Sequence, residues 1–199
     1  MSESKPDDKN RRYLLAASIA GAGIASVASA APFVLSMFPS ARAKAAGAPV
    51  EVDISKVEPG MLMRTEWRGQ PVWVLHRTPV MLEAIKKMDQ LVADPGSEKS
   101  QQPEYAKNEY RSKKPEYLVL VGICTHLGCS PTDKLQAGPD SGLGGDWQGG
   151  FFCPCHGSKF DLAGRVFKDV PAPKNLTVPP YQFLSDTRLL VGDDKEQKA

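Results

Sequence analysis

Two short boxes of cysteine and histidine dominate the chemistry that this sequence could perform. They read Cys124-Thr125-His126-Leu127-Gly128-Cys129 and Cys153-Pro154-Cys155-His156-Gly157-Ser158. Together they contain all 4 cysteines of the 199-residue chain and two of its 3 histidines. Thiolates and imidazoles gathered in this way indicate a metal centre before any other use.

The spacing of the two boxes is not that of a structural zinc site, which pairs its ligands as Cys-x2-4-Cys. Each box offers one Cys and one His at close range, Cys124 with His126 and Cys153 with His156. Such a set suits a [2Fe–2S] cluster with thiolates on one iron and imidazoles on the other. The surplus cysteines, one in each box, would suit a disulfide.

Two other interpretations of the boxes leave residues without a role. A zinc-binding module without redox activity would leave the extra cysteines unexplained. Two plain disulfides would leave both histidines unexplained.

Two neutral imidazoles in place of two thiolates make a cluster easier to reduce, because they lower its negative charge. An imidazole can exchange its outer proton, so electron transfer can be coupled to proton transfer.

The two boxes resemble those of the Rieske iron–sulfur protein of the bacterial cytochrome bc1 complex, ubiquinol:cytochrome c reductase. The resemblance extends from the N-terminal arginines to about Val191. It implies one Rieske-type [2Fe–2S] cluster, with Cys124 and Cys153 on one iron and the catalytic histidines His126 and His156 on the other. It also implies a disulfide between Cys129 and Cys155.

The resemblance assigns further roles around the cluster. Ser158 is expected to donate a hydrogen bond that stabilises the reduced cluster, and Phe160 stands where many members have a tyrosine that tunes the potential. Shielding of the cluster and docking to partners are implied for Leu127, Gly128, Pro171, Ala172 and Pro173. The loop that begins at Val170 departs from the family pattern, which often has glycine at that position.

The implied function is electron transfer within a respiratory complex. The protein would oxidise ubiquinol at the quinol site of cytochrome b and pass the electron to cytochrome c1 with proton release, in a dimeric complex. The alternative is the small Rieske subunit of a periplasmic oxidase such as arsenite oxidase. The anchor, the linker and the 170–173 loop favour the first function. A soluble Rieske ferredoxin would lack both an anchor and the extra cysteine pair.

A long uncharged segment predicts one N-terminal transmembrane helix. Residues 13–38 contain no charged side chain and would form a helix of about 39 Å, enough to span a bilayer. Residues 10–15, Asn-Arg-Arg-Tyr-Leu-Leu, resemble a twin-arginine export signal. An ordinary cleaved signal is the alternative, with a cleavage site at residues 28–30, but the apolar run continues beyond it.

The charges around this segment predict its orientation in the lipid of the bacterial inner membrane. The basic residues before it, Lys5, Lys9, Arg11 and Arg12, outnumber Arg42 and Lys44 after it, so we expect a cytoplasmic N-terminus and a periplasmic head. A disulfide can persist there. The predicted organisation is therefore residues 1–12 in the cytoplasm, 13–38 as anchor, 39–50 as hinge linker and 51–199 as the Rieske domain, with its cluster-binding part at about 120–175.

The rest of the chain predicts a mostly β fold, and the resemblance implies an antiparallel β sandwich with a small cluster-binding β subdomain. Strand patterns occur at 50–54, 117–123 and 150–152, and hairpins at 61–77, around Gly69, and at 181–191. Thr78-Pro79 predicts a helix start, and we expect this helix to end before Asp94. The polar residues 97–114 predict a surface insertion. A glycine-rich loop is expected over 138–150.

The remaining features exclude some functions. The net charge of +2, without a basic patch interleaved with aromatic residues, gives no support for nucleic-acid binding. His76 lies in a strand pattern away from both boxes and is expected to be structural. The sequon Asn175-Leu176-Thr177 is interpreted as a chance match.

Overall fold

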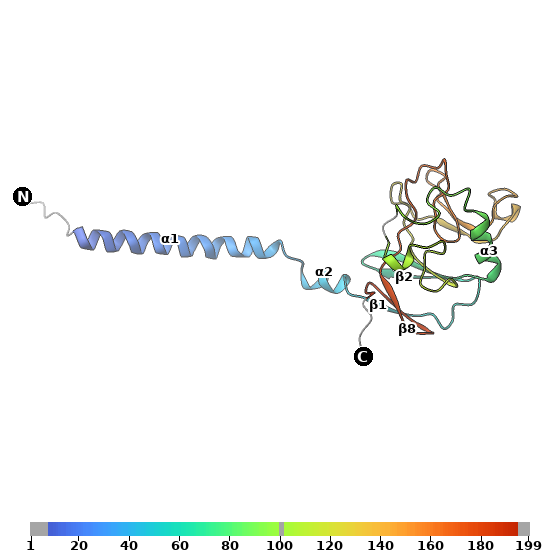
Figure 1. Ribbon diagram of the computed structural model, residues 1–199. Helices are drawn as coiled ribbons and strands as arrows, with labels where there is room; N and C mark the ends of the chain where they lie inside the picture. Colours follow the sequence, from blue (N-terminus) through green and yellow to red (C-terminus); the bar gives the residue numbers. More distant parts are fainter. Residues whose placement is uncertain (1–7, 100–101, 195–199) are drawn as a thin grey trace, which may run out of the picture. The chain divides into compact units, whose positions relative to one another are not determined.

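The computed structural model describes residues 8–99 and 102–194, and the chain divides into two compact units, Met1–Ala45 and Ala46–Ala199. Figure 1 shows the long helix of the first unit and the strands of the second. Lys5, one of the basic residues used to predict orientation, lies outside the described residues.

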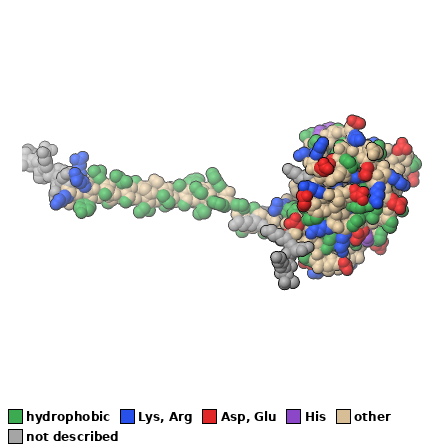
Figure 2. Space-filling view, viewed as in Figure 1, with side chains coloured by type: hydrophobic (Ala, Val, Ile, Leu, Met, Phe, Trp, Pro, Cys, Tyr) green, Lys and Arg blue, Asp and Glu red, His purple; other side chains and the backbone are tan. Residues whose placement is uncertain are grey.

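The first unit is built on helix α1, Asp8–Ser36, whose 29 residues extend about 43 Å. Figure 2 shows apolar side chains along this helix and Lys and Arg side chains at its start. The hydroxyls of Ser18 and Ser26 donate to the carbonyls of Leu14 and Ala22, each at 2.8 Å, so they are satisfied inside the helix. By length and composition, this helix can cross a membrane.

A second short helix follows within the region predicted as linker. Helix α2 spans Ala41–Ala46, and the Ser40 hydroxyl accepts a hydrogen bond of 3.1 Å from the backbone N–H of Ala43. Ser40 therefore supplies the acceptor that the first turn of a helix otherwise lacks.

The second unit, the head, is mostly antiparallel β structure, as predicted. Within its described residues it holds three three-stranded sheets, in the orders β1-β9-β8, β2-β3-β4 and β5-β6-β7. In the first sheet β9 lies between β1 and β8 (Figure 1). The strands are β1 (Val50–Asp53), β2 (Leu62–Trp67), β3 (Gln70–His76), β4 (Tyr117–Val121), β5 (Thr132–Lys134), β6 (Gly150–Phe152), β7 (Lys159–Phe160), β8 (Tyr181–Ser185) and β9 (Arg188–Val191).

The predicted hairpins and helix are confirmed. Strands β2 and β3 pair from Trp67 opposite Gln70, which leaves Arg68 and Gly69 as a turn with positive φ at both residues. Helix α3 spans Pro79–Lys87, and the Thr78 side chain accepts from the backbone N–H of Met81. The glycine-rich 138–150 region is loop apart from a short 3-10 helix, Pro139–Ser141, and its last residue, Gly150, which begins β6.

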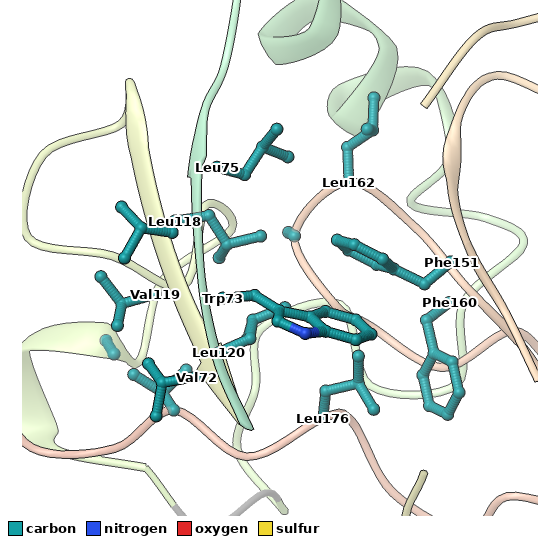
Figure 3. Close-up of a cluster of buried hydrophobic side chains, with 14 of the residues drawn as sticks. Val72, Trp73, Leu75, Leu118, Val119, Leu120, Phe151, Phe160, Leu162 and Leu176 are labelled. Atoms are coloured by element: carbon teal, nitrogen blue, oxygen red, sulfur yellow. The ribbon is translucent and has the colours of Figure 1, made fainter. Parts of the chain in front are cut away.

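The core joins the β2-β3-β4 sheet to the sheet that carries the second box. The Trp73 ring of β3 stacks on Phe151 of β6, with ring centroids 5.1 Å apart. Figure 3 shows Phe151 and Leu176 on opposite sides of the Trp73 ring. Phe151 and Leu176 are fully buried, and Trp73 is nearly so, so the position of strand β6 is fixed by apolar packing.

The prediction of a surface insertion over residues 97–114 is wrong for its buried positions, although Glu98, Lys99, Glu104 and Lys107 are exposed as expected and residues 100 and 101 lie outside the described residues. Ser97, Ala106 and Arg111 are fully buried, and a 3-10 helix lies at Glu104–Ala106. The Tyr105 hydroxyl donates to the Tyr181 carbonyl at 3.0 Å and accepts from the Tyr181 N–H at 2.8 Å. The polar composition was misleading because these side chains satisfy buried backbone groups instead of facing water.

Two buried arginines, Arg77 and Arg111, connect the 97–114 segment to the rest of the head by hydrogen bonds. Arg77 donates to the carbonyls of Tyr110 and Pro115 and to the Ser112 hydroxyl. Burial lowers the pKa of Arg77, and that of Arg111, to about 10. Both guanidinium groups therefore stay charged at neutral pH. An arginine in this setting satisfies several carbonyls at once with its fixed fork of donors.

A glycine next to the first box tests the packing. A Cβ at Gly122 would lie 2.2 Å from the Trp73 ring, so we expect Gly122→Ala to lower the free energy of unfolding by about 1–3 kcal/mol. Gly145→Ala is the matched control, since Gly145 has open space around it and no positive φ. Denaturant unfolding of both variants measures the effect. Equal unfolding midpoints for Gly122→Ala and Gly145→Ala would contradict the prediction.

Candidate metal centre

The two boxes form loops with the same backbone hydrogen bonds. In the first loop, the Cys124 N–H donates to the Cys129 carbonyl at 2.7 Å and the Gly128 N–H donates to the Cys124 carbonyl at 3.0 Å. In the second, the Cys153 N–H donates to the Ser158 carbonyl at 2.8 Å and the Gly157 N–H donates to the Cys153 carbonyl at 2.9 Å. Each loop thus begins with a cysteine, delivered by strand β4 or β6, and turns back after five residues.

Glycine at the fifth position of each loop has a conformational reason. Gly128 has φ of 84° and Gly157 has φ of 78°, values that L side chains rarely adopt. The Gly in both boxes of the sequence therefore marks the point where the chain reverses. Because the turns match, the two leading cysteines occupy equivalent positions.

These leading cysteines are the free thiols of the site. Cys124 and Cys153 are each 2% exposed, and neither takes part in a disulfide. They are near enough that the Cys153 side chain contributes to the raised pKa of Cys124. The structure therefore brings together the two thiols that the sequence predicted as ligands of one iron.

The two histidines of the boxes also lie together. The ring centroids of His126 and His156 are 4.8 Å apart and the ring planes are nearly perpendicular, at 88°. His126 is half-buried and His156 is exposed. The site is therefore arranged with thiols on the buried side and imidazoles that reach solvent.

The predicted disulfide between Cys129 and Cys155 is confirmed. It joins the two loops across 26 positions of sequence, with Cα atoms 6.7 Å apart. The sulfur atoms of Cys129, Cys153 and Cys155 lie within 4.8 Å of one another. Two of these three sulfurs are bonded together in the disulfide, so only Cys153 among them is available to a metal ion.

Burial controls the protonation of the first thiol. Burial raises the pKa of Cys124, and the neighbouring Cys153 side chain acts in the same direction, while the His126 backbone N–H and the Ser158 hydroxyl lower it. The raised pKa means that this thiol keeps its proton at neutral pH when no metal is bound. Metal binding would therefore release a proton from it.

Ser158 connects the second loop to a third segment, the 170–173 loop. Its hydroxyl oxygen accepts a hydrogen bond of 3.0 Å from the backbone N–H of Ala172, and its hydroxyl contacts the Cys124 sulfur. Ala172 is buried, whereas Pro171 and Pro173 on either side of it are exposed. Lys174, which follows, accepts a hydrogen bond of 2.6 Å at its carbonyl from the Thr125 hydroxyl.

The residues predicted to shield and dock lie at the surface or just beneath it. Leu127 is 71% exposed, and Gly128 beside it is exposed. An exposed leucine at the apex of a loop contributes nothing to the core of the head. Its position is compatible with contact to another protein.

Phe160 and His76 lie outside the two boxes. Phe160 is fully buried on β7, pairs with Phe151 and belongs to the same apolar cluster as Cys124 and Cys153. His76 is structural, as predicted: its Nδ1 lies 2.7 Å from the Val57 carbonyl and its ring stacks on Tyr117.

Comparison with known proteins decides the family. Residues 104–182 match the model of the Rieske [2Fe-2S] domain. The chain is 59% identical over 199 residues to the ubiquinol-cytochrome c reductase iron-sulfur subunit of Allochromatium vinosum, covering 98% of this chain and 94% of that protein. It is 42% identical to the subunit of the same name from Blastochloris viridis, covering 96% and 98% of the two chains. The chain belongs to the family of ubiquinol-cytochrome c reductase iron-sulfur subunits.

A solved structure described as a hyperthermophilic respiratory Complex III is also similar, at 25% identity. The alignment covers 87% of this chain and 98% of the chain in that structure, with a TM-score of 0.46. The sequence relatives, and not this structure, establish the family.

The residues of this family member fit its [2Fe–2S] cofactor. Two free buried thiols on one side and two imidazoles on the other would supply the mixed sulfur and nitrogen donors of a Rieske centre. The disulfide leaves these two thiols as the only unbonded ones among all 4 cysteines of the sequence. The apolar N-terminal helix agrees with a membrane-anchored subunit.

Several contacts of the site could not be found from the sequence. Strand β5, Thr132–Lys134, has no apolar residue and strand β7 has only two residues, so neither gives a strand pattern in the sequence. The hydrogen bonds Thr125–Lys174 and Ser158–Ala172 join residues 49 and 14 positions apart. No local pattern encodes such pairs.

The disulfide generates a prediction for stability. It closes a loop of 26 positions, so in the chain-entropy model we expect Cys129→Ser or Cys155→Ser to lower the free energy of unfolding by about 3–4 kcal/mol. Unfolding of the full chain, with and without reductant, measures this. Reductant is expected to destabilise the parent but neither variant. A parent protein that unfolds at the same denaturant concentration in both conditions contradicts the prediction.

Proposed function

We propose that this protein is the electron-transfer subunit of a respiratory cytochrome bc1 complex, oxidising ubiquinol at cytochrome b and passing the electron to cytochrome c1 with proton release. What supports the proposal most is the site found in this member of the family: two free buried thiols and two solvent-reaching imidazoles on matched loops. The [2Fe–2S] cofactor, when bound, supplies one-electron redox chemistry.

Cys124 and Cys153 are proposed to hold the buried side of the cofactor. Their burial excludes water from the sulfur ligands, and the His126 N–H and the Ser158 hydroxyl point hydrogen bonds at the Cys124 sulfur. Donors that face a ligand sulfur reduce its electron density and favour the reduced state.

His126 and His156 are proposed to hold the solvent-facing side and to handle the proton. An imidazole that binds a metal through one nitrogen keeps the other nitrogen free. Because His156 is exposed and His126 is half-buried, such a nitrogen can meet the hydroxyl of a quinol that approaches from outside. Once that nitrogen has released its own proton, it can accept a hydrogen bond, and then the proton, from that hydroxyl. Leu127, Gly128 and the Pro171-Ala172-Pro173 loop are proposed to surround this point and contact the partner proteins.

The N-terminal unit is proposed to anchor the subunit in the lipid of the bacterial inner membrane, with residues 1–12 in the cytoplasm and the head in the periplasm. The hinge is proposed at residues 39–50, between the anchor at 13–38 and the Rieske domain at 51–199, whose cluster-binding part covers about 120–175. Lys9, Arg11 and Arg12 at the start of α1 support this orientation. A periplasmic head agrees with the Cys129–Cys155 disulfide, which an oxidising compartment preserves. The complex is proposed to be a dimer.

Purification from native membranes tests the function directly. We expect the protein to co-purify in mild detergent with b-type and c-type cytochromes, with quinol:cytochrome c activity. A Cys153→Ser chain, with the iron-binding thiol removed, is expected to lose that activity. Isolation with a periplasmic oxidase such as arsenite oxidase instead would contradict the proposal.

The hydrogen bonds to the ligand sulfurs generate a further prediction. Ser158→Ala removes the hydroxyl that contacts Cys124, so we expect a lower midpoint potential. Phe160→Tyr adds a hydroxyl to a fully buried ring in the cluster that includes Cys124 and Cys153, and we expect it to raise the potential. Protein-film voltammetry measures both shifts, which are expected to add if the donors act on different sulfur atoms.

A control separates tuning from misfolding. A buried tyrosine hydroxyl without a partner would cost about 1–3 kcal/mol of stability. A Phe160→Tyr variant that is less stable than the parent and has an unchanged or lower potential would show that the ring does not point at a ligand sulfur.

A further inference from the structure

A chain of hydrogen bonds connects the 97–114 segment to the candidate metal centre. It begins at Ser97, which is fully buried and has φ of 57°, in the left-handed region that serine rarely adopts. The Ser97 hydroxyl oxygen accepts hydrogen bonds from Arg111 Nε at 2.5 Å and from Asn175 Nδ2 at 3.0 Å. Two separate side chains are therefore oriented by one hydroxyl.

Arg111 uses its other donors to close the base of a loop. Its Nη1 donates to the carbonyls of Ala163 and Gly164, each at 3.2 Å, and its Nη2 donates to the Leu176 carbonyl at 2.6 Å. The Leu176 N–H donates to the Gly164 carbonyl at 2.8 Å across the same base. The guanidinium thus holds together the two ends of the segment 163–176.

Asn175 secures the same segment from inside. Its Oδ1 accepts from the Val166 N–H at 2.9 Å, and its Nδ2 donates to the Asp94 carbonyl at 3.1 Å as well as to Ser97. Asn175 is 2% exposed, and all of these bonds are made inside the fold. The folded chain therefore gives this asparagine a structural role, which agrees with a chance match to the glycosylation sequon.

The segment held in this way carries Ala172, the donor to Ser158. A serine hydroxyl has a single proton, and its oxygen can accept while that proton is donated elsewhere. Because the Ser158 oxygen accepts from the Ala172 N–H, the Ser158 proton remains available for donation toward the candidate metal centre. If Ala172 moves away, the hydroxyl loses the contact that fixes its direction.

We propose that Ser97 is a positioning residue for the redox centre, acting through Arg111 and Asn175 on the 163–176 segment and hence on the Ala172–Ser158 hydrogen bond. The proposal rests on the proposed function, because it assumes that Ser158 tunes a cofactor held by Cys124. Residues 97–114 thus help to hold the 163–176 segment beside the site, although they lie outside both boxes.

The test compares Ser97→Ala with Ser141→Ala in the full chain. Ser141 is a matched control because it is also buried, donates to the Gly138 carbonyl at 2.7 Å and accepts from the Leu143 N–H at 3.1 Å. Both variants lose one buried hydroxyl with two hydrogen bonds. Only Ser97 is connected to Ala172 by the contacts described.

The first measurement is hydrogen exchange at the 170–173 loop, followed by mass spectrometry. Pro171 and Pro173 have no amide hydrogen, so the run Val170-Pro171-Ala172-Pro173 reports only on Val170 and Ala172. We expect exchange of the Ala172 amide to rise about fivefold to tenfold in Ser97→Ala and to stay unchanged in Ser141→Ala. This measurement is independent of electron transfer.

The second measurement is the midpoint potential in two backgrounds. We expect Ser97→Ala to lower the potential of the parent but not that of Ser158→Ala, because both changes act through the same hydroxyl. Equal shifts in both backgrounds, or unchanged exchange at Ala172, would overturn the proposal. A Ser158→Ala chain with the potential of its parent, together with faster exchange at Ala172 in Ser97→Ala, would instead refute the tuning role assumed for Ser158.

A second variant covers failure of Ser97→Ala to fold. Asn175→Asp preserves the size of the side chain and the oxygen that accepts from Val166, but it removes the group that donates to Ser97 and to the Asp94 carbonyl. We expect Asn175→Asp to raise exchange of the Ala172 amide as Ser97→Ala does. In the Ser158→Ala background we expect it to leave the midpoint potential unchanged. Unchanged Ala172 exchange in a folded Asn175→Asp chain would overturn the proposal.

Discussion

The separation between two loops is the constraint on which the rest of the site depends. Cys124 and Cys153 come from different strands, and a cofactor shared between their loops needs both sulfurs at a fixed distance. Matched backbone hydrogen bonds shape each loop internally, and the Cys129–Cys155 disulfide fixes one loop against the other. Apolar packing of Trp73 on Phe151 holds strand β6, which delivers Cys153, against strand β3. A covalent and an apolar constraint therefore both act on the elements that carry the two thiols.

A third segment completes the surroundings of the site. The 170–173 loop reaches Ser158 through Ala172, and its position depends on polar contacts with residues far away in the sequence. Arg111 is central to these contacts, because one buried guanidinium satisfies three carbonyls, of Ala163, Gly164 and Leu176. A charged side chain inside the head is stable only when it is satisfied in this way. The polar network is thus as important as the apolar core for the geometry of the site.

The sequence predicted the strongly patterned elements and missed the polar ones. The hairpin at Gly69, the helix capped by Thr78 and the closing hairpin follow from turn chemistry, capping and alternation, which are local properties. The cysteine and histidine boxes identified the metal centre because their residue types have few other uses together. Residues 97–114 were misjudged because composition indicates only that a segment is polar. Whether Ser97 and Arg111 face water or buried carbonyls depends on partners more than 50 positions away, such as Ala163.

Pulsed electron paramagnetic resonance of the reduced protein tests the central claim most directly. Protein grown with nitrogen-15 histidine, compared with unlabelled protein, reports which ring nitrogens are bonded to iron. We expect couplings from two histidine nitrogens, together with the low average g-value of mixed nitrogen and sulfur ligation, and loss of this signal when His126 or His156 is replaced. A spectrum without histidine couplings would contradict the assignment of these two residues to one iron and of Cys124 and Cys153 to the other.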